Sequence, residues 1–479
     1  MSNLSELLPT GGGQNAVDFV ATGNLASGQA VVLKTDGTVE AITSGAEGLG
    51  TPVVFEAATS NYIATTYDST NNKVVIAYQD NGNGNYGTAI VGTVSGTSIS
   101  FGTPVIFESA GSYYMAIVFD SNANKVVIAY DDGGNSSYGT AIVGTVSGTS
   151  ISFGSAVVFE SAESGQYGIA ATFDSTNNKV VIAYLDDANS FYGTAIVGTV
   201  SGTSISFGTA VVFESNTSAF PSATFDSTNG KVVIACRPTN RSFYGHAIVG
   251  TVSGTSISFG TSVAFNAGTT SGSSPTFDST NNKIVIVYDY DAGVTGSAVV
   301  GTVSGTSISF GTPVVFSAAS TSHPRVTYDS TNNKIVIAYN NAGNNGAGTY
   351  VVGTVSGTSI SFGTAVVYES TAGYNSPTFD STANKTVITY QESSGYGNAV
   401  ILTVGSTNNT SFIGITSEAI SSGATGAINT YGGINTVQTG LTIASDYYVQ
   451  DDGSLSTTTS TVKAGQAISA TTINMKDLT

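Results

Sequence analysis

The sequence of 479 residues predicts an all-β fold, and three observations lead to this prediction. The composition favours strands, because Val, Thr, Tyr and Phe are frequent, Gly reaches 58 residues and charged residues make up only 9%. The segment GTVSGTSISFG occurs six times without a change. A second pattern, Asp-Ser followed by a Lys-led apolar run, recurs seven times at intervals of 51 to 54 residues. Its copies begin at Asp68, Asp120, Asp174, Asp226, Asp278, Asp329 and Asp380.

Each repeat contains four candidate strands. In the first repeat they are residues 62–68, 73–78, 87–94 and 99–108, which we call strands a, b, c and d. Strand b, KVVIAY, is apolar almost throughout, so both of its faces must be covered. Four-stranded sheets that cover one another at a period near fifty residues are typical of a β-propeller. The seven repeats of about 52 residues therefore predict a seven-bladed β-propeller.

The order of the strands also predicts how the ring closes. The strand d pattern GTPVVFE occurs at 50–56, before any complete repeat, whereas the last strand c, near 400–404, has no such copy after it. We therefore expect the first strand to complete the last blade. A β-helix or an open stack of repeats, the alternative architectures, would have no use for this permutation.

The turns between strands separate constant from variable sequence. In a four-stranded meander, the a–b and c–d turns lie at one end of the sheet, and these are the constant pieces STNN and SGTS. The b–c loops differ in every repeat, for example QDNGNGNY, LDDANSFY and RPTNRSFY, and so do the d–a connections, for example AATSN and AGSYY. We expect these connections to be loops. Because binding residues concentrate on loops of a rigid scaffold, the variable end is the place to look for a binding site.

Aromatic residues among Asn, Ser and Gly make the variable loops suitable for contact with a sugar or a protein. In the b–c loops they are Tyr86, Tyr138, Phe191, Tyr192, Phe243, Tyr244 and Tyr396, and in the d–a connections Tyr113, Tyr114, Tyr167 and Tyr374. The loop RPTNRSFYGH alone contains basic residues. The predicted ligand-binding residues are Arg237, Arg241, Tyr86, Tyr138, Tyr192, Tyr244 and Tyr396. The alternative for the loop tyrosines is packing against the neighbouring blade.

No catalytic arrangement emerges from the sequence. Glycoside hydrolysis needs two carboxylates at a defined separation. The acids of the variable loops are spread around the ring, and we interpret them as solvated charges: Asp131, Asp132, Asp186, Asp187, Asp289, Asp291, Glu163 and Glu392. The two histidines, His246 and His323, lie in different blades without a Cys or carboxylate at metal-binding spacing. We expect neither an enzyme nor a bound metal or cofactor.

Two further residue types are interpreted as structural. The Asp of each DSTNNK segment can accept backbone N–H groups across its turn, with calcium binding as the alternative. The segment lacks the ligand spacing of an EF-hand loop, and without Trp it cannot form the box of sialidases. The single cysteine, Cys236, stands where other repeats have Tyr, which favours a buried structural thiol over a nucleophile.

The charge and the N-terminal sequence restrict partners and location. A formal net charge of −18, with only 13 Lys and Arg, argues against nucleic acid and against an anionic membrane surface as partners. The N-terminal residues MSNLSELLPTGGGQN have neither a basic region nor an apolar core, so they do not form a Sec signal peptide. No stretch is long and apolar enough for a transmembrane helix. We expect the chain to fold in a cytoplasm.

The repeats are flanked by two segments of different sequence, residues 1–48 and 412–479. Both contain short alternating apolar runs separated by Gly turns, which indicate strands. Neither is long enough for a comfortable core of its own. Since the two ends of a propeller meet, we expect the flanks to pair into one discontinuous β-sandwich or barrel-like domain, with the propeller of residues 49–411 inserted in it.

The flanks carry a resemblance to a known class of protein. ATGNLASGQAVVLKTDGTV near the start, and FIGITSEAISSGATG, GLTIASDYYVQDDGSLSTT and VKAGQAISATTI near the end, resemble the terminal modules of virion structural proteins from tailed bacteriophages, especially marine ones. The resemblance covers roughly a quarter of the chain and contributes no functional residue. It implies a virion component whose flanking domain anchors it to the capsid or tail.

The functional expectation combines these points. It is a non-enzymatic phage virion surface protein, a tail fibre or spike or a capsid decoration, whose propeller attaches to a glycan or protein of the host surface. Other virion proteins are the expected partners, and self-association through the flanks, as in trimeric fibres, is a further expectation. The alternative is a propeller lectin or a glycan-degrading enzyme that acts on cell-surface polysaccharide. A bacterial adhesin would need an export signal.

Overall fold

The computed structural model describes residues 15–42, 47–164, 168–290, 295–405, 411–450, 453–458, 460 and 462–475. The chain divides into two compact units, one of residues 48–404 and one of residues 1–47 with 405–479, compared with 49–411 expected for the repeats. Among the described residues there are strands, turns and short 3-10 turns but no α-helix, so the predicted all-β class is confirmed. No helix in this part of the chain could span a membrane.

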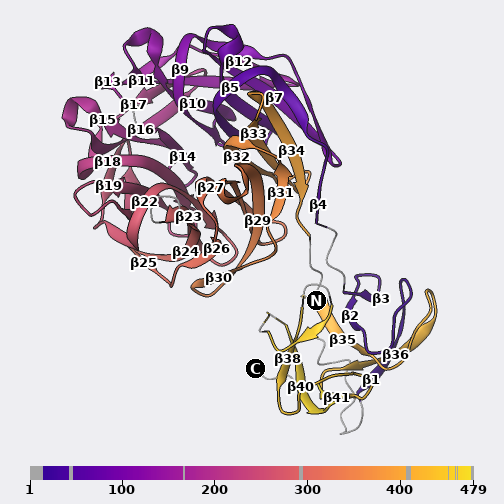
Figure 1. The fold of residues 1–479 in the computed structure, drawn as a ribbon. Coiled ribbons are helices and arrows are strands. Elements are labelled where there is room, and N and C mark those ends of the chain that lie inside the picture. Colours follow the sequence, from indigo (N-terminus) through magenta and orange to yellow (C-terminus); the bar gives the residue numbers. More distant parts are fainter. Residues whose placement is uncertain are drawn as a thin grey trace. The chain divides into compact units, whose positions relative to one another are not determined.

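The first repeat forms an antiparallel four-stranded sheet, as predicted. Its inner strand is the second half of β5 (Val53–Asp68), followed by β6 (Lys73–Asp80) and β7 (Tyr86–Ser95). The outer strand has two pieces, β8 (Ser98–Phe101) and the first half of β9 (Val105–Asp120), which pair with opposite halves of β7. The sheets of this unit stand side by side around a common centre (Figure 1).

The strand order recurs along the unit. The remaining strands are β4 (Gly48–Leu49), β10 (Lys125–Asp132), β11 (Tyr138–Ser147), β12 (Ser150–Phe153), β13 (Val157–Glu163), β14 (Ala170–Asp174), β15 (Lys179–Asp186), β16 (Tyr192–Ser201), β17 (Ser204–Phe207), β18 (Val211–Asp226), β19 (Lys231–Pro238), β20 (Tyr244–Ser253), β21 (Ser256–Phe259), β22 (Val263–Asp278), β23 (Lys283–Tyr290), β24 (Thr295–Ser304), β25 (Ser307–Phe310), β26 (Val314–Ser317), β27 (Thr321–Asp329), β28 (Lys334–Asn341), β29 (Ala347–Ser356), β30 (Ser359–Phe362), β31 (Val366–Glu369), β32 (Ala372–Asp380), β33 (Lys385–Glu392) and β34 (Tyr396–Thr403). The described b–c loops include the 3-10 turns η2 (Asn81–Asn83), η3 (Gly133–Asn135), η4 (Asp187–Asn189) and η5 (Ala342–Asn344).

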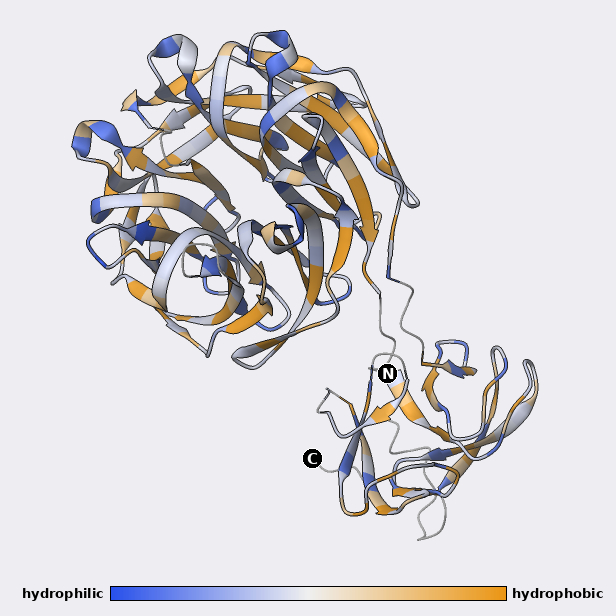
Figure 2. Ribbon diagram, in the orientation of Figure 1, coloured by the Kyte–Doolittle hydropathy of each residue, from blue (hydrophilic) through white to orange (hydrophobic). Residues whose placement is uncertain are grey.

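The core of this unit lies between neighbouring sheets. Strand b of each repeat is buried on both faces, as its continuous apolar sequence predicts. One buried cluster, for example, joins Val75 and Ala77 of repeat 1 with Val126 and Ile128 of repeat 2. Hydrophobic residues are concentrated in the strands, and hydrophilic residues in the loops at their ends (Figure 2).

The d–a connections are not loops, so this prediction is wrong for several repeats. β9 runs unbroken from Val105 to Asp120, pairing with β7 by its first half and with β10 by its second half. β5, β18 and β22 are equally long strands. The reason is that the backbone hydrogen bonds pass directly from strand c of one sheet to strand b of the next. A bend at Tyr114, in the β-bulge near the start of the half that pairs with β10, has a left-handed backbone with φ of 49°.

The predicted closure by the first strand is confirmed. β34, strand c of the last repeat, pairs with the first half of β5 through Ala399 opposite Val53 and Gly397 opposite Glu56. β4 adds a short pairing to the other end of the same strand, with Leu49 opposite Leu402. The N-terminal residues of this unit thereby complete the sheet of its last repeat.

Three glycines of the constant segment GTVSGTSISFG are required by their surroundings in the first copy. A Cβ atom at Gly92 would lie 2.7 Å from the Ile99 side chain, so the first glycine makes room for the isoleucine of the same copy. Gly96 has a φ of 60° at the tight c–d turn, which favours glycine. A Cβ atom at Gly102 would lie 1.8 Å from the carbonyl oxygen of Thr149, which belongs to the next copy. Consecutive copies therefore contact each other directly.

The second unit combines strands from both ends of the chain. One sheet has the order β1 (Ala16–Val20), β36 (Thr425–Thr430), β35 (Phe412–Thr416), β2 (Ala30–Leu33) and β3 (Val39–Ala41). The other has the order β37 (Ile434–Asn435), β41 (Thr472–Asn474), β40 (Lys463–Ser469), β38 (Asp446–Val449) and β39 (Leu455–Ser456). A shared core, with Val32 and Ile415 from the first sheet and Val449 and Ile473 from the second, lies between them.

Candidate binding site

The strand pairing assigns each connection to one end of the sheets. Asp68 pairs with Lys73 and Ser95 with Ser98, so the a–b and c–d turns share one end, which we call the constant end. The b–c loop begins at Asp80 and lies at the opposite end, which we call the variable end. The bends between outer and inner strands lie there too. This assignment agrees with the prediction.

At the constant end the repeated aspartates accept hydrogen bonds within their own a–b turns, as predicted. The Asp68 Oδ1 atom accepts hydrogen bonds from the backbone N–H groups of Thr70 and Asn71 at 3.0 and 2.9 Å, and Oδ2 accepts one from the Asn71 side chain at 2.8 Å. Both carboxylate oxygens are therefore satisfied by the turn itself. In the described part of the chain, no group of three or more His, Cys, Asp or Glu residues could hold a metal ion.

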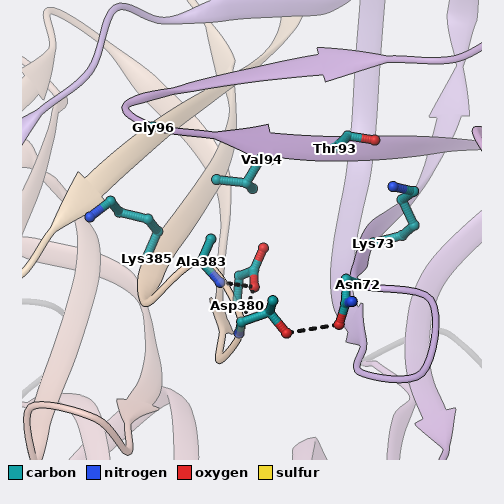
Figure 3. A pocket seen from close by; sticks show the side chains of 9 residues that line it. Asn72, Lys73, Thr93, Val94, Gly96, Asp380, Ala383 and Lys385 are labelled. Carbon is teal, nitrogen blue, oxygen red and sulfur yellow. Dashed lines mark hydrogen bonds between the residues drawn. The ribbon is translucent and has the colours of Figure 1, made fainter.

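A pocket of about 450 Å³ lies at the constant end between repeats 1 and 7 (Figure 3). The Thr382 hydroxyl donates a hydrogen bond to the Asn72 side chain across it at 2.8 Å. Asp380 accepts the backbone N–H of Ala383, as the equivalent Asp68 accepts that of Asn71. Ala383 is shorter than Asn71, which leaves space in this corner. Its lining comes from the repeated turns, so we assign the pocket to the ring-closing contact.

At the variable end, the bend residues form an unusual set. The equivalent positions in the successive repeats are Tyr62, Tyr114, Gly168, Phe220, Gly272, His323 and Tyr374. All five non-glycine residues have φ between 49° and 54°. This left-handed region is unfavourable for bulky side chains, and such strained residues concentrate at functional sites. In these five repeats the bend therefore turns a large side chain out of the regular strand at a conformational cost.

Four tyrosines from three repeats meet at these bends. The Tyr62 ring centre lies 4.9 Å from that of Tyr114, 5.4 Å from Tyr374 and 5.9 Å from Tyr113. We call Tyr62, Tyr113, Tyr114 and Tyr374 the tyrosine cluster. Tyr374 is 39% exposed, so the cluster is open to solvent. Burial raises the pKa of Tyr62 above its ordinary value, which keeps this hydroxyl protonated at neutral pH.

Side-chain amides accompany the tyrosine cluster. Asn61, next to Tyr62, donates to the side-chain oxygens of Gln79 and Asn81, both at 3.2 Å. Gln391 of repeat 7 donates to the Asn61 side chain and to the Ser60 carbonyl oxygen, both at 2.8 Å. These bonds link the first and last repeats and hold the amide groups in place. Fixed amides beside aromatic rings can recognise hydroxyl groups and apolar ring faces together.

Arg237 lies in strand β19 and not in a loop, so the predicted loop position is wrong. Its guanidinium carbon lies 4.9 Å from the Phe220 ring centre and 5.5 Å from that of Phe243. Its Nη1 atom donates to the carbonyl oxygen of Thr270 in the next repeat at 3.2 Å. Gln79 makes the equivalent bond to Ser112 at 3.0 Å. Arg237 thus bridges two repeats, and a ligand-binding role for it stays a prediction.

Arg241 has a structural partner that explains its place in repeat 4. Its Nη2 atom lies 3.2 Å from the Glu214 carboxylate, whose side chain is only 4% exposed. In the first repeat the equivalent carboxylate, Glu56, accepts a hydrogen bond from Tyr78 at 3.0 Å. In repeat 4 this tyrosine is replaced by Cys236. The Asn216 side-chain amide donates to the Glu214 Oε1 atom at 2.8 Å, and Arg241 supplies the charged partner of Oε2, the other carboxylate oxygen.

Cys236 is buried and free, in agreement with the predicted structural thiol. Burial raises its pKa to about 12, so the thiol is protonated at neutral pH. A buried protonated thiol is a poor nucleophile.

The other predicted tyrosines are spread around the variable end. Tyr86, Tyr138, Tyr192 and Tyr244 each begin a strand c and are half-buried, whereas Tyr396 is 38% exposed. Within the described residues none of these five rings contacts another aromatic ring. Their packing against a neighbouring blade and their role in binding both stay predictions. Tyr167 lies outside the described residues.

Several acids of the variable end are buried, so their interpretation as solvated charges is wrong. Asp131, Asp132 and Asp289 are 3%, 7% and 3% exposed. They lie at the ends of strands, where backbone N–H groups need acceptors: Asp132 accepts from Gly134, and Asp289 accepts from Ser271 and Gly272. Asp186 similarly accepts a hydrogen bond from the backbone N–H of Asn189, and Glu392 accepts one from the Ser394 hydroxyl. Asp291 lies outside the described residues.

His246 is buried in strand β20. Its Nδ1 atom lies 3.2 Å from the Ser262 hydroxyl. Burial, with help from Arg241, lowers the pKa of His246 to about 4, so the ring is neutral at pH 7. It belongs to the packing between strands and lies outside the tyrosine cluster.

Sequence reasoning missed two residues of this region. Tyr62 falls at the start of a predicted strand, although the repeat spacing aligns it with Tyr114 and Tyr374. Arg325 follows His323 by two residues in inner strand β27, where the same spacing aligns it with Ala and Ser. The signal was the alignment of the seven repeats position by position, which shows where one copy departs from the others.

Comparison with known proteins gives a fold but no family. No family model matches the chain, and no curated protein matches it. Among solved structures, the BP39L lectin from Burkholderia pseudomallei has a TM-score of 0.56 at 10% identity, over 74% of this chain and 98% of that chain. A triple arginine-to-alanine mutant of AofleA from Arthrobotrys oligospora has a TM-score of 0.45 at 10% identity, over 72% of this chain and 97% of that chain. The first likeness, together with the strand pairing, identifies the repeat-bearing unit as a β-propeller.

Proposed function

We propose that this protein binds glycans without cleaving them, and that the variable end of its propeller is the binding surface. The observation that carries the proposal is the tyrosine cluster, where strained backbone and three repeats bring Tyr62, Tyr114 and Tyr374 together. A sugar ring has apolar faces that pack on aromatic rings and hydroxyls that bond to amides. Both groups are present side by side. The likeness to a lectin of the same fold supports this choice.

The glycan test compares two tyrosines at the same end. Tyr374 and Tyr396 are 39% and 38% exposed, but only Tyr374 belongs to the cluster. The full-length protein would be applied to an array of bacterial surface polysaccharides, and its best ligand then titrated by calorimetry. We expect Tyr374→Ala to weaken binding about tenfold, and Tyr396→Ala to change it less than about twofold.

Three results would count against glycan binding through the cluster. They are no binding to any glycan, equal affinity for wild type and Tyr374→Ala, or a loss confined to Tyr396→Ala. Release of cleaved sugar during the same incubations would favour the glycan-degrading alternative.

We further propose that the propeller has seven blades and that the terminal unit attaches it to a phage particle. The seven repeats and the pairing of β34 with β5 support the blade number. The phage-like phrases of both flanks support the attachment. The virion surface, on head or tail, is the proposed location. Imaging of intact phage particles with an antibody to the propeller would test it, and labelling of host membranes instead would contradict it.

The terminal unit also offers a surface for self-association or for other virion proteins. Ile443 is 64% exposed and Ile468 is 48% exposed. They are next to Ala444 and Ala467, which are joined by a backbone hydrogen bond of 2.8 Å, so the two isoleucines lie close together. Because exposed apolar patches often belong to contact surfaces, this pair is our candidate for one. Light scattering of the full chain and of the double variant Ile443→Ser, Ile468→Ser measures the effect: a homo-oligomer, a trimer for instance, should lose mass in the variant.

A further inference from the structure

One basic side chain lies among the inner strands of the propeller. Arg325 of β27 pairs with Ala338 of strand b. The residues that occupy this position in the other repeats are all small: Ala64, Ala116, Ala170, Ser222, Ser274 and Ser376. Each pairs with the equivalent residue of its own strand b. Arg325 is therefore the single long side chain at a level where the described inner strands otherwise present methyl and hydroxymethyl groups.

This level of the inner strands surrounds the centre of the propeller. The backbone N–H of Thr65 donates to the Ser376 hydroxyl of repeat 7 at 3.0 Å, and the hydroxyls of Ser222 and Ser273 lie 3.3 Å apart between repeats 4 and 5. Neighbouring inner strands thus contact one another, and in a propeller they enclose a central channel. Small residues keep such a channel open, so the Arg325 side chain has room in it.

Arg325 is exposed to solvent, yet protein atoms surround it. Its accessible surface places it among the exposed residues, whereas burial lowers its pKa. Both observations fit a side chain inside a water-accessible channel. The outer surface of the protein would give exposure without desolvation, and the packed core would give desolvation without exposure.

The hydrogen-bonding capacity of Arg325 is largely unused. Its Nη1 atom donates to the carbonyl oxygen of Pro324 at 3.1 Å, whereas a guanidinium has five N–H donors. Among the described residues no carboxylate lies within 4.0 Å of it. Asp289 is near enough to raise the pKa of Arg325, but its Oδ1 atom already accepts N–H groups from Ser271 and Gly272 at 2.6 and 2.7 Å.

His323 lies next to this arginine at the rim of the inner strands. It occupies the bend position of repeat 6, and Tyr374 occupies the same position in repeat 7. Burial and the charge of Arg325 lower the pKa of His323, so the ring is neutral at pH 7 and has one donor and one acceptor nitrogen. His323 is therefore a neutral imidazole two residues before Arg325, at the bend position that Tyr374 occupies in the next repeat.

We propose that Arg325, together with His323 two residues before it, binds the carboxylate of an acidic sugar. The glycans recognised by this propeller would then be acidic ones. A guanidinium matches a carboxylate through two parallel N–H···O bonds. The neutral histidine can bond a neighbouring hydroxyl. In a protein of net charge −18, an acidic glycan needs a local cation to bind, and Arg325 supplies one that has no carboxylate within 4.0 Å among the described residues. The inference rests on the proposed glycan binding.

The test measures the charge preference of the full-length protein. Calorimetric titrations would use matched pairs of methyl glycosides, glucoside with glucuronide and galactoside with galacturonide. The variants are Arg325→Gln, Arg325→Lys and, as a control that removes one positive charge at the constant end, Lys73→Gln. We expect wild type to prefer the acidic member of at least one pair about tenfold, which corresponds to one good charged hydrogen-bonding pair.

The variants should separate the arginine from net charge. Arg325→Gln should bring the two members of the pair within about twofold and leave the neutral sugar unchanged. Arg325→Lys should keep part of the preference, and Lys73→Gln should keep all of it. Thermal unfolding checks that each variant folds, which we expect because the other repeats have Ala or Ser at the position of Arg325.

A second arm uses sulfate ion, which needs no sugar-binding surface. Sulfate at millimolar concentration should raise the unfolding temperature of wild type more than that of Arg325→Gln. If sulfate shows this difference but no sugar binds, the proposed function fails and the anion site stands. If sugars bind without a charge preference, or with a preference that Arg325→Gln leaves intact, the acidic-sugar inference is overturned and the function stands. If neither sugar nor sulfate binds, both fail.

Discussion

The constant and variable ends of the propeller differ in what each repeat contacts. At the constant end a repeat contacts the same motif in its neighbour: Gly102 lies against Thr149, and Thr70 donates to Asn124 at 2.7 Å. A segment in such a contact lies between the equivalent segments of two neighbouring repeats. A substitution in one copy therefore disturbs the contacts with both neighbours. At the variable end the contacts of the bend residues differ between repeats: Tyr62 packs on Tyr114 and Tyr374, whereas Phe220 packs on Arg237 of its own repeat. We therefore infer that contacts between copies keep the segment constant, and the diverse end is the one where we propose that a ligand binds.

The largest expected effect breaks the contact between copies. Gly102→Ala places a methyl group 1.8 Å from the Thr149 carbonyl oxygen, a backbone atom that cannot move away freely. We expect a loss of about 3 kcal/mol in the free energy of unfolding. Gly363→Ala is the matched control, because it changes the same letter of the last GTVSGTSISFG copy, where a Cβ atom meets only the Val352 carbonyl oxygen at 3.7 Å.

Denaturant unfolding of both variants measures this difference. A small loss in the Gly363 variant beside a large loss in the Gly102 variant would support the contact between copies as the source of the constraint. Equal losses would attribute the cost to the glycine itself and remove the proposed reason for the constancy of the segment.

A second expected effect concerns repeat 4, where Cys236 replaces the tyrosine that bonds to the buried glutamate in the first repeat. Arg241→Ala should cost about 1 kcal/mol of stability, because it removes the cation beside the buried Glu214 carboxylate and leaves only the hydrogen bond from Asn216; the partial exposure of the arginine reduces the cost. Adding Cys236→Tyr should recover most of this loss, since the new hydroxyl can donate to Glu214 as Tyr78 donates to Glu56. Melting temperatures of the single and double variants test this pairing. A double variant no more stable than Arg241→Ala would contradict it.

Most of the strand framework could be predicted from the sequence, because repetition turns weak local patterns into a strong signal. The apolar strand b and the displaced GTPVVFE at 50–56 gave the sheets and the pairing of first with last strands. The d–a connections could not be predicted. AATSN and AGSYY have the small and polar residues of loops, yet they are strands, because they hydrogen-bond to two different sheets in turn. That partnership exists only in the assembled propeller.

The candidate site was predicted in outline. Tyr113, Tyr114 and Tyr374 were placed at the correct end from the sequence, but their meeting with Tyr62 depends on the left-handed bend of each strand, which the letters do not show. Arg237 and Arg241 stood out as the basic residues of one loop segment. Their partners, a pair of phenylalanine rings and a buried glutamate, come from strands distant in sequence. The sequence therefore places these residues at the variable end, whereas their contacts depend on the assembled strands; which of them bind a ligand stays a prediction.

The smallest expected effect is a pH dependence that belongs to one repeat. The pKa of His246 is lowered to about 4 in the folded protein, from about 6.5 in the unfolded chain, mainly by burial. Between these values the unfolded chain binds a proton that the folded protein does not, so stability should fall as the pH drops from 6.5 towards 4. Above 6.5 both states are neutral at this residue, and it contributes no pH dependence. His246→Thr, which installs the residue of repeats 1 to 3, should flatten the curve in this window by on the order of 1 kcal/mol. Unfolding temperatures of both proteins at pH 7.5, 6, 5 and 4.5 measure it, and parallel curves for wild type and variant would show that His246 does not carry the effect.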